Sequence, residues 1–148
     1  MQDCKNPIFL AQSDTTVGFL CADFTKLNAL KKRESKKNVL LSVDNNVKLK
    51  ELTRVPEIHK NRVRKAKKST FIYKNNLAIR VIKDKKHSDF LQFLPFLYST
   101  SANLHKQDFD EKFALESVDI IVLDDREMAQ KEASKIFKLS NKNIKRIR

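Results

Sequence analysis

The chain of 148 residues contains a single glycine, Gly18, where average usage of about 7% would give roughly ten. This excludes glycine-rich phosphate loops. A Walker loop needs two glycines around its lysine and a dinucleotide fingerprint needs three, because the backbone must approach phosphate where a Cβ would clash. Any nucleotide that binds here must therefore be held by side chains.

The chain is also strongly basic, with 31 Lys or Arg against 18 Asp or Glu and a formal net charge of +13. Such a charge attracts polyanions, of which RNA and DNA are the leading candidates. The alternative is a Lys-rich composition without a polyanionic partner. The length and the hydrophobic content of 41% predict one domain over residues 1–148 with its own core.

Positive charge is densest between residues 60 and 68. This run offers few aromatic side chains for stacking on bases, so we expect contacts to the backbone or duplex of tRNA or double-stranded RNA rather than readout of bases. The alternative is a solvated helix face. The candidate RNA-binding residues are Lys60, Arg62, Arg64, Lys65, Lys67 and Lys68.

The cysteines and histidines lack the short spacing of metal-ligand pairs, and we expect no metal site. Cys21 is expected to be a buried hydrophobe, and the histidines are expected at the surface: His59, His87 and His105. Apolar runs fall far short of the roughly eighteen residues of a membrane helix. We therefore expect a cytoplasmic protein that is neither secreted nor membrane-spanning.

Short apolar runs alternate with polar segments. They predict strands over 7–11, 38–43, 70–73, 77–82, 97–100 and 118–123, and edge strands over 136–147. Helices are predicted after the caps Thr25 and Ser88, the first running to about Arg33, and also over 47–52, from Pro56, and over 110–116. Because no strict βαβ repeat is present, the fold class is α/β, with a twisted sheet of mixed direction and flanking helices.

Three polar clusters, 13–16, 31–37 and 99–103, fall at predicted strand ends, where open α/β sheets bind ligands. Their hydroxyls and amides can donate to phosphate or carboxylate oxygens, and Lys31 and Arg33 supply positive charge. The alternatives are an ordinary Ser/Thr turn and a solvated helix end.

The order and spacing of these clusters resemble the threonylcarbamoyl-AMP synthase family, the YrdC/Sua5-like proteins, over nearly the whole chain. Residues 12–19 stand where the family has Pro-Thr-(Asp/Glu)-Thr-x-Tyr-Gly-Leu, with Gly18 on the family glycine. Residues 31–33 match Lys-x-Arg, and residues 79–82 resemble Val-Arg-(Ile/Val)-Pro. Thr-Ser-Ala-Asn stands intact at residues 100–103.

The chain departs from the family pattern at several points. Trp-Pro-Gly-Pro is replaced by residues 65–68, and the Ser-Gly after Thr-Ser-Ala-Asn-x is His105-Lys106. Ser134 begins the segment that stands for Ser-Thr-Val-Val, and the chain ends at Arg148, before the usual Pro-Gly.

The resemblance implies a two-stage reaction in a basic cleft. Bicarbonate and L-threonine give N-carboxythreonine, whose carboxylate attacks the α-phosphate of ATP to form threonylcarbamoyl-AMP and pyrophosphate. The product would feed the tRNA threonylcarbamoyl transferase machinery. ATP would arrive with Mg²⁺, for which no acidic cluster forms a protein cage.

The resemblance also implies the roles of individual residues. The alternative is a protein of the same fold that has lost catalysis and binds tRNA or ribosomal RNA. Catalysis and nucleotide binding would fall to Lys31, Arg33, Ser101 and Asn103, with Arg148 closing over the nucleotide, and threonine would be bound by Ser13, Thr15, Arg80 and Ser134.

Overall fold

The computed structural model describes residues 5–104 and 106–148. Within them, one mixed sheet has the strand order β7-β1-β2-β6-β3-β5-β4-β8-β9. The pairs β1–β7, β3–β5 and β4–β8 are parallel and the others antiparallel. The strands are β1 Phe9–Gln12, β2 Val17–Cys21, β3 Leu40–Val43, β4 Ser69–Ile72, β5 Ala78–Val81, β6 Leu97–Ser101, β7 Ile120–Ile121, β8 Lys135–Leu139 and β9 Ile144–Arg146.

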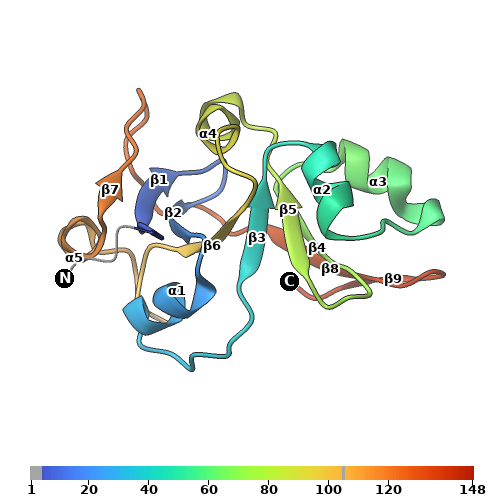
Figure 1. The fold of residues 1–148 in the computed structure, drawn as a ribbon, viewed down its shortest axis with the longest axis horizontal. Coiled ribbons are helices and arrows are strands. Elements are labelled where there is room, and N and C mark those ends of the chain that lie inside the picture. Colours follow the sequence, from blue (N-terminus) through green and yellow to red (C-terminus); the bar gives the residue numbers. More distant parts are fainter. Residues whose placement is uncertain (1–4, 105) are drawn as a thin grey trace.

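Short helices flank this sheet, as the sequence predicted. In Figure 1, α2 and α3 are grouped beside β3, β5 and β4, whereas α5 lies next to β7 at the other end. The helices are α1 Phe24–Leu30, α2 Asn46–Leu52, α3 Lys60–Lys65, α4 Lys85–Leu91 and α5 Glu111–Ser117, and the short 3-10 helix η1 Glu57–His59 leads into α3. No helix in the described part of the chain has the length and apolar character that crossing a membrane requires.

One face of β3, β4 and β5 packs against helices, and the other face lines a pocket. Leu41 and Ile79 pack with Leu49 of α2 and Val63 of α3 in one hydrophobic core. Because successive side chains of a strand point to opposite faces, the intervening residues lie on the other side of the sheet. There they line a pocket: Leu40, Ser42, Thr70, Ile72, Ala78 and Arg80.

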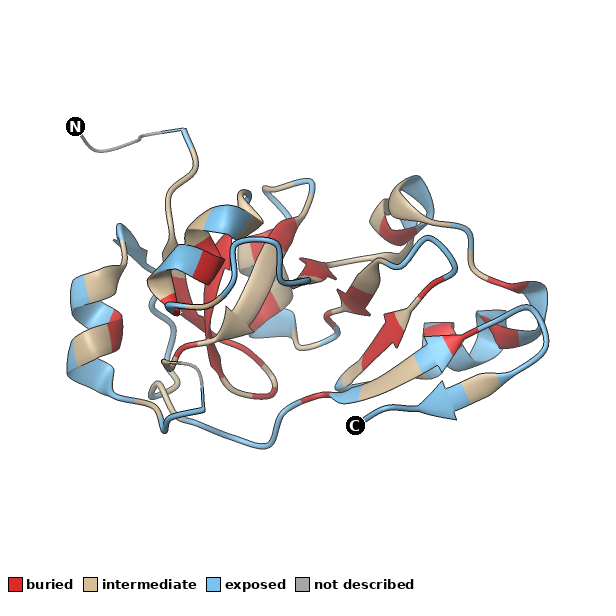
Figure 2. Ribbon diagram, turned by 90° about the horizontal axis from the view of Figure 1, so that it is seen from below, coloured by how far each residue is buried: buried red, intermediate tan, exposed pale blue. Residues whose placement is uncertain are grey.

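Two further hydrophobic clusters hold the other end of the sheet. Leu10 and Phe19 pack with Leu27 of α1 and Ala114 of α5, and Leu20 packs with residues of α4 and β6. Figure 2 shows the buried residues concentrated in the strands, while much of the helix surface is exposed. Hydrophobic clusters thus stabilise both ends of the sheet, and the pocket lies between them.

Both predicted helix caps are wrong. Asp23 caps α1 by accepting from the Thr25 backbone N–H at 2.9 Å, and Asp84 caps α4. In each case a carboxylate precedes the predicted hydroxyl, and it offers a charged acceptor to the helix N-terminus. The first helix also ends at Leu30, earlier than predicted, because Lys32 has a φ of 54° that no right-handed helix accommodates.

Three expectations about the strands also need correction. The 118–123 strand pairs only over Ile120–Ile121. β2 was not predicted, because burial of all its residues hides the alternation that marks a strand. β8 is not an edge strand, since it pairs with both β4 and β9.

The histidine prediction is wrong for two residues: His59 and His87 are only 4% and 3% exposed. His59 Nε2 lies 3.0 Å from the carbonyl oxygens of both Ser140 and Asn143, so it closes the β8–β9 turn. Burial of Cys21 is confirmed, and His105 lies outside the described residues.

Candidate active site

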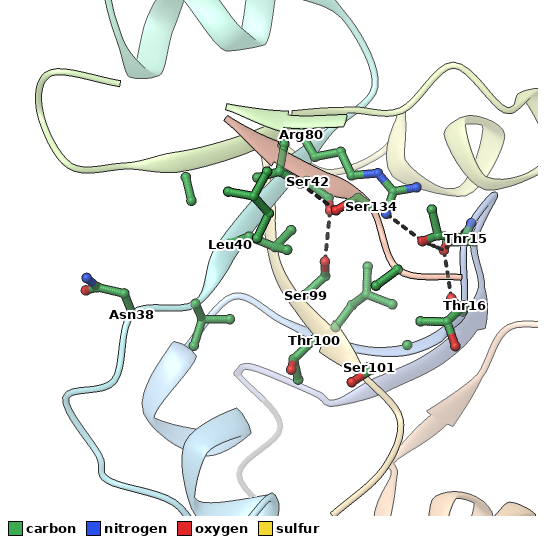
Figure 3. A pocket seen from close by; sticks show the side chains of 18 of the residues that line it. Thr15, Thr16, Asn38, Leu40, Ser42, Arg80, Ser99, Thr100, Ser101 and Ser134 are labelled. Atoms are coloured by element: carbon green, nitrogen blue, oxygen red, sulfur yellow. Dashed lines mark hydrogen bonds between the residues drawn. The ribbon is translucent and has the colours of Figure 1, made fainter. Parts of the chain in front are cut away.

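A pocket of about 470 Å³ lies on the open face of the sheet. Figure 3 shows Arg80 and Thr15 on one side of it and Thr100 and Ser101 on the other. Its lining includes every residue for which the sequence predicted a catalytic, nucleotide-binding or threonine-binding role: Ser13, Thr15, Lys31, Arg33, Arg80, Ser101, Asn103, Ser134 and Arg148.

Lys31 follows the last turn of α1 and is only 4% exposed. Its Nζ donates to the Ser101 carbonyl at 2.8 Å, Thr100 Oγ1 at 3.1 Å, Ser101 Oγ at 3.2 Å and Asn103 Oδ1 at 3.3 Å. None of these acceptors is charged. Lys31 therefore lacks a countercharge among these partners. Burial, reinforced by Arg33 and Lys37, lowers the pKa of Lys31 to about 8.

Arg33 joins the same end of the pocket. Its Nε donates to Asn28 Oδ1 at 2.7 Å, and Nη2 reaches Thr100 Oγ1 at 3.4 Å. Asn28 is itself buried and donates to the Ser35 and Lys37 carbonyls, which folds the loop after α1 back on the helix. Asn28 is thus a positioning residue that sequence reasoning missed.

Arg80 forms the opposite end of the pocket. It is only 5% exposed, pairs with the carboxylate of Asp14, and donates from Nη1 to Thr15 Oγ1 at 2.8 Å. Ser13 Oγ lies 3.1 Å from that same hydroxyl. Arg80 Nε is buried without a hydrogen-bond partner in the described part of the chain. Burial and the nearby Arg148 lower the pKa of Arg80 to about 10.

The parallel pairing of β4 and β8 brings Ser134 and Arg148 to this same end. Ser134 Oγ lies 2.8 Å from Thr70 Oγ1. Arg148 Nε donates to the Ser134 carbonyl at 3.0 Å, and its Nη2 lies 3.3 Å from Ser134 Oγ. Arg148 therefore contributes a second guanidinium to this end of the pocket.

Sequence reasoning missed two functional candidates here. Asp14 stands between Ser13 and Thr15, and an acidic residue inside a hydroxyl cluster was a signal for a buried cation partner. His87 also lines the pocket; burial, with help from Arg80 and Arg126, lowers its pKa to about 4. At neutral pH its imidazole is uncharged and adds no further positive charge.

The pocket is strongly cationic. Among the described residues that line it, none is acidic, and six are cationic: Lys31, Arg33, Lys37, Arg80, Lys106 and Arg148. A concave site with one sign of charge concentrates ligands of the opposite sign. In the described ranges, no group of three or more His, Cys, Asp or Glu side chains is placed to hold a metal ion.

The predicted RNA-binding residues lie outside this pocket. All six are exposed, on α3 and on the loop that leads to β4. The β4–β8 pairing sets the β8–β9 hairpin next to that region, with exposed Lys135, Lys138, Lys145 and Arg146. The structure therefore places a second basic segment, about seventy positions later in the sequence, next to the first.

The fold and pocket define an α/β protein with a cationic pocket on the open face of a mixed sheet. The chain belongs to the Sua5/YciO/YrdC family, described as "Telomere recombination", whose model matches residues 5–148. No sequence among the curated proteins matches the chain.

Solved structures show the same fold. E. coli YciO is 13% identical with a TM-score of 0.77, and the match covers 97% of this chain and 83% of that one. MTH1692 from Methanobacterium thermoautotrophicum is 18% identical with a TM-score of 0.72, covering 96% and 79%.

Two larger proteins contain the fold as a part. P. abyssi Sua5, solved in complex with L-threonine, is 12% identical with a TM-score of 0.71, and the match covers 96% of this chain and 50% of that one. Full-length HypF, in a phosphate- and nucleotide-bound form, is 14% identical with a TM-score of 0.75, covering 96% and 26%. The chain thus spans about half of one protein and a quarter of the other.

Proposed function

We propose that the protein is a threonylcarbamoyl-AMP synthase that uses L-threonine, bicarbonate and ATP. The supporting observation is that one pocket carries two cationic ends, Lys31 with Arg33 and Arg80 with Arg148, and no acidic lining residue among those described. The substrates present two kinds of anion, a phosphate chain and an amino-acid carboxylate. Two cationic ends in one pocket match that pair.

In this proposal the nucleotide occupies the Lys31 end. Lys31 and Arg33 offset the charge on the α-phosphate, while Ser101 and Asn103 hold the Lys31 ammonium in place. A water-poor site strengthens such interactions most when the groups are fixed before the reaction. The uncharged acceptors around Lys31 keep its positive charge available for phosphate.

Threonine occupies the Arg80 end, where the guanidinium groups of Arg80 and Arg148 attract the substrate carboxylate. Ser13, Thr15 and Ser134 provide hydroxyls around it. The carbamate oxygen of N-carboxythreonine forms the new bond to the α-phosphorus as the bond to the bridging oxygen of pyrophosphate breaks. No general base is needed, because the nucleophile is already an anion. Mg²⁺ would accompany ATP as part of the substrate.

The test is pyrophosphate release with labelled L-threonine. We expect release only when threonine, bicarbonate and ATP are all present, and we expect the labelled product to carry AMP. Omitting each substrate in turn is the control. Release that does not depend on threonine would contradict the proposal.

A second candidate function is RNA binding without catalysis. It is favoured by the basic end of the sheet, where residues 60–83 and 133–148 contain no acidic residue. tRNA and a double-stranded RNA of similar length would be compared in a filter-binding assay. Binding of either RNA by a protein that releases no pyrophosphate would support this alternative. If both activities occur, the product would be passed in the cytoplasm to the tRNA threonylcarbamoyl transferase machinery.

A further inference from the structure

Three lysines adopt a left-handed backbone conformation, with φ of 54° at Lys32, 50° at Lys68 and 61° at Lys106. Residues that carry a Cβ rarely adopt this backbone conformation, which glycine adopts without strain. Lys32 and Lys68 do not line the pocket, whereas Lys106 does. Lys106 therefore combines an unfavourable backbone conformation with a place at the site.

The turn that carries Lys106 is held by Asn103, another residue that lines the pocket. The Gln107 backbone N–H donates to the Leu104 carbonyl at 2.9 Å, which makes Lys106 the third residue of the turn. With a positive φ, that position ordinarily takes glycine or asparagine. Asn103 Nδ2 donates to the carbonyls of both Leu104 and Gln107, so one side chain clamps both ends of the turn.

The same Asn103 side chain accepts from Lys31 through Oδ1. One amide thus links the buried cation to the turn that presents the exposed one. Lys31 is 4% exposed and suits a phosphate held deep in the pocket, whereas Lys106 lies at the solvent side. Lysine is a compact charge on a flexible stem and can follow a terminal phosphate.

We propose that Lys106 binds the β- and γ-phosphates of ATP, and thereby the pyrophosphate that leaves. This inference rests on the proposed function. As the bond between the α-phosphorus and the bridging oxygen breaks, that oxygen keeps the electron pair and pyrophosphate gains negative charge. Lys106 offsets this charge at the mouth while Lys31 and Arg33 remain with the α-phosphate.

The test compares ATP with AMP by isothermal titration calorimetry, because only ATP carries the distal phosphates. The wild-type protein binds ATP more tightly than AMP. Lys106→Gly and Lys106→Gln each weaken ATP binding about tenfold, as expected for one lost charge-assisted contact, and leave AMP binding unchanged. Lys106→Gly also raises the Tm by about 2 °C, because it relieves the backbone strain, whereas Lys106→Gln does not.

Lys32→Gly is the matched control, since Lys32 has the same conformation outside the pocket lining. It raises the Tm in the same way and leaves ATP binding unchanged. ATP binding equal to wild type in both Lys106 variants would overturn the role of Lys106 alone, as would equal binding of AMP and ATP by the wild type. Failure of the wild type to bind either nucleotide would overturn the proposed function as well.

Discussion

The guanidinium of Arg80 forms an ion pair with the carboxylate of Asp14, and the two side chains are only 6% and 12% exposed. This contact joins β5 to the loop between β1 and β2, two parts of the sheet that are not neighbours. It also leaves Arg80 Nε without a hydrogen-bond partner in the described part of the chain. Asp14 thus supplies the countercharge for this buried guanidinium.

Asp14→Asn is expected to destabilise the protein by about 3 kcal/mol, because a buried guanidinium would lose its countercharge. Urea unfolding monitored by circular dichroism measures the change. Asp89→Asn is the control. It removes a carboxylate that pairs with Lys85 at the surface, and such pairs contribute less than about 1 kcal/mol. Equal effects of the two substitutions would show that burial of the Asp14–Arg80 pair is unimportant.

Lys31→Ala and Arg33→Lys are each expected to lower threonine-dependent pyrophosphate release about a hundredfold or more, on the order of 3 kcal/mol. Arg33→Lys keeps the charge but removes the planar fork. Lys32→Ala should have little effect, because Lys32 is exposed and outside the pocket lining. If Lys32→Ala lowered pyrophosphate release as much as Lys31→Ala, Lys-x-Arg would not be a phosphate site.

Binding of AMP should weaken as the pH rises through about 8, where Lys31 loses its proton in the folded protein. An ordinary lysine would stay charged to about pH 10. The unfolded chain keeps this proton above pH 8, so this residue's contribution to the free energy of unfolding rises with pH over the same interval. Calorimetry at pH 7, 8 and 9 measures the change in affinity.

Lys31→Arg provides the comparison for this pH series, because a guanidinium remains protonated throughout. Whatever its affinity at pH 7, the variant should show a flatter pH dependence between 7 and 9. A decline as steep as that of the wild type would assign the titration to another group.

Replacing Arg62, Lys65 and Lys67 with Ala should weaken tRNA binding and lower the slope of its salt dependence by about three units or less. These side chains are exposed and lie apart from the pocket, so pyrophosphate release should be unaffected. The control replaces Lys112 and Lys131, which lie in the acidic segment 108–132. An unchanged slope in the triple variant would identify the run as a solvated helix face.

Many of the residues that line the pocket could be identified from local sequence. Thr-Ser-Ala-Asn at 100–103 and Lys-x-Arg at 31–33 carry their residue types in short motifs, and all the residues predicted from them line the pocket. The mixed sheet was also predicted. Helix caps were missed because Asp, Ser and Thr can all cap a helix, and only the observed start of each helix shows that Asp23 and Asp84 do so.

Contacts between distant segments were beyond the sequence. The burial of His87 and the Asp14–Arg80 pair depend on how distant segments pack together, and the meeting of α3 with the β8–β9 hairpin depends on the parallel β4–β8 pairing. Secondary-structure propensity and hydrophobic periodicity carry information only about residues that are close in the sequence. Partners across a sheet are set by register, because a shift of one residue turns every side chain to the other face.

Gly18 shows what the sequence alone determined and what only the tertiary structure explains. The sequence alone determined that this chain has no glycine-rich phosphate loop, since one glycine cannot build one. Only the tertiary structure explains the glycine itself: a Cβ at position 18 would lie 3.1 Å from the Thr100 carbonyl oxygen. β2 and β6 pair there at the pocket wall, so the absence of a side chain lets the Ser/Thr strand pass close by.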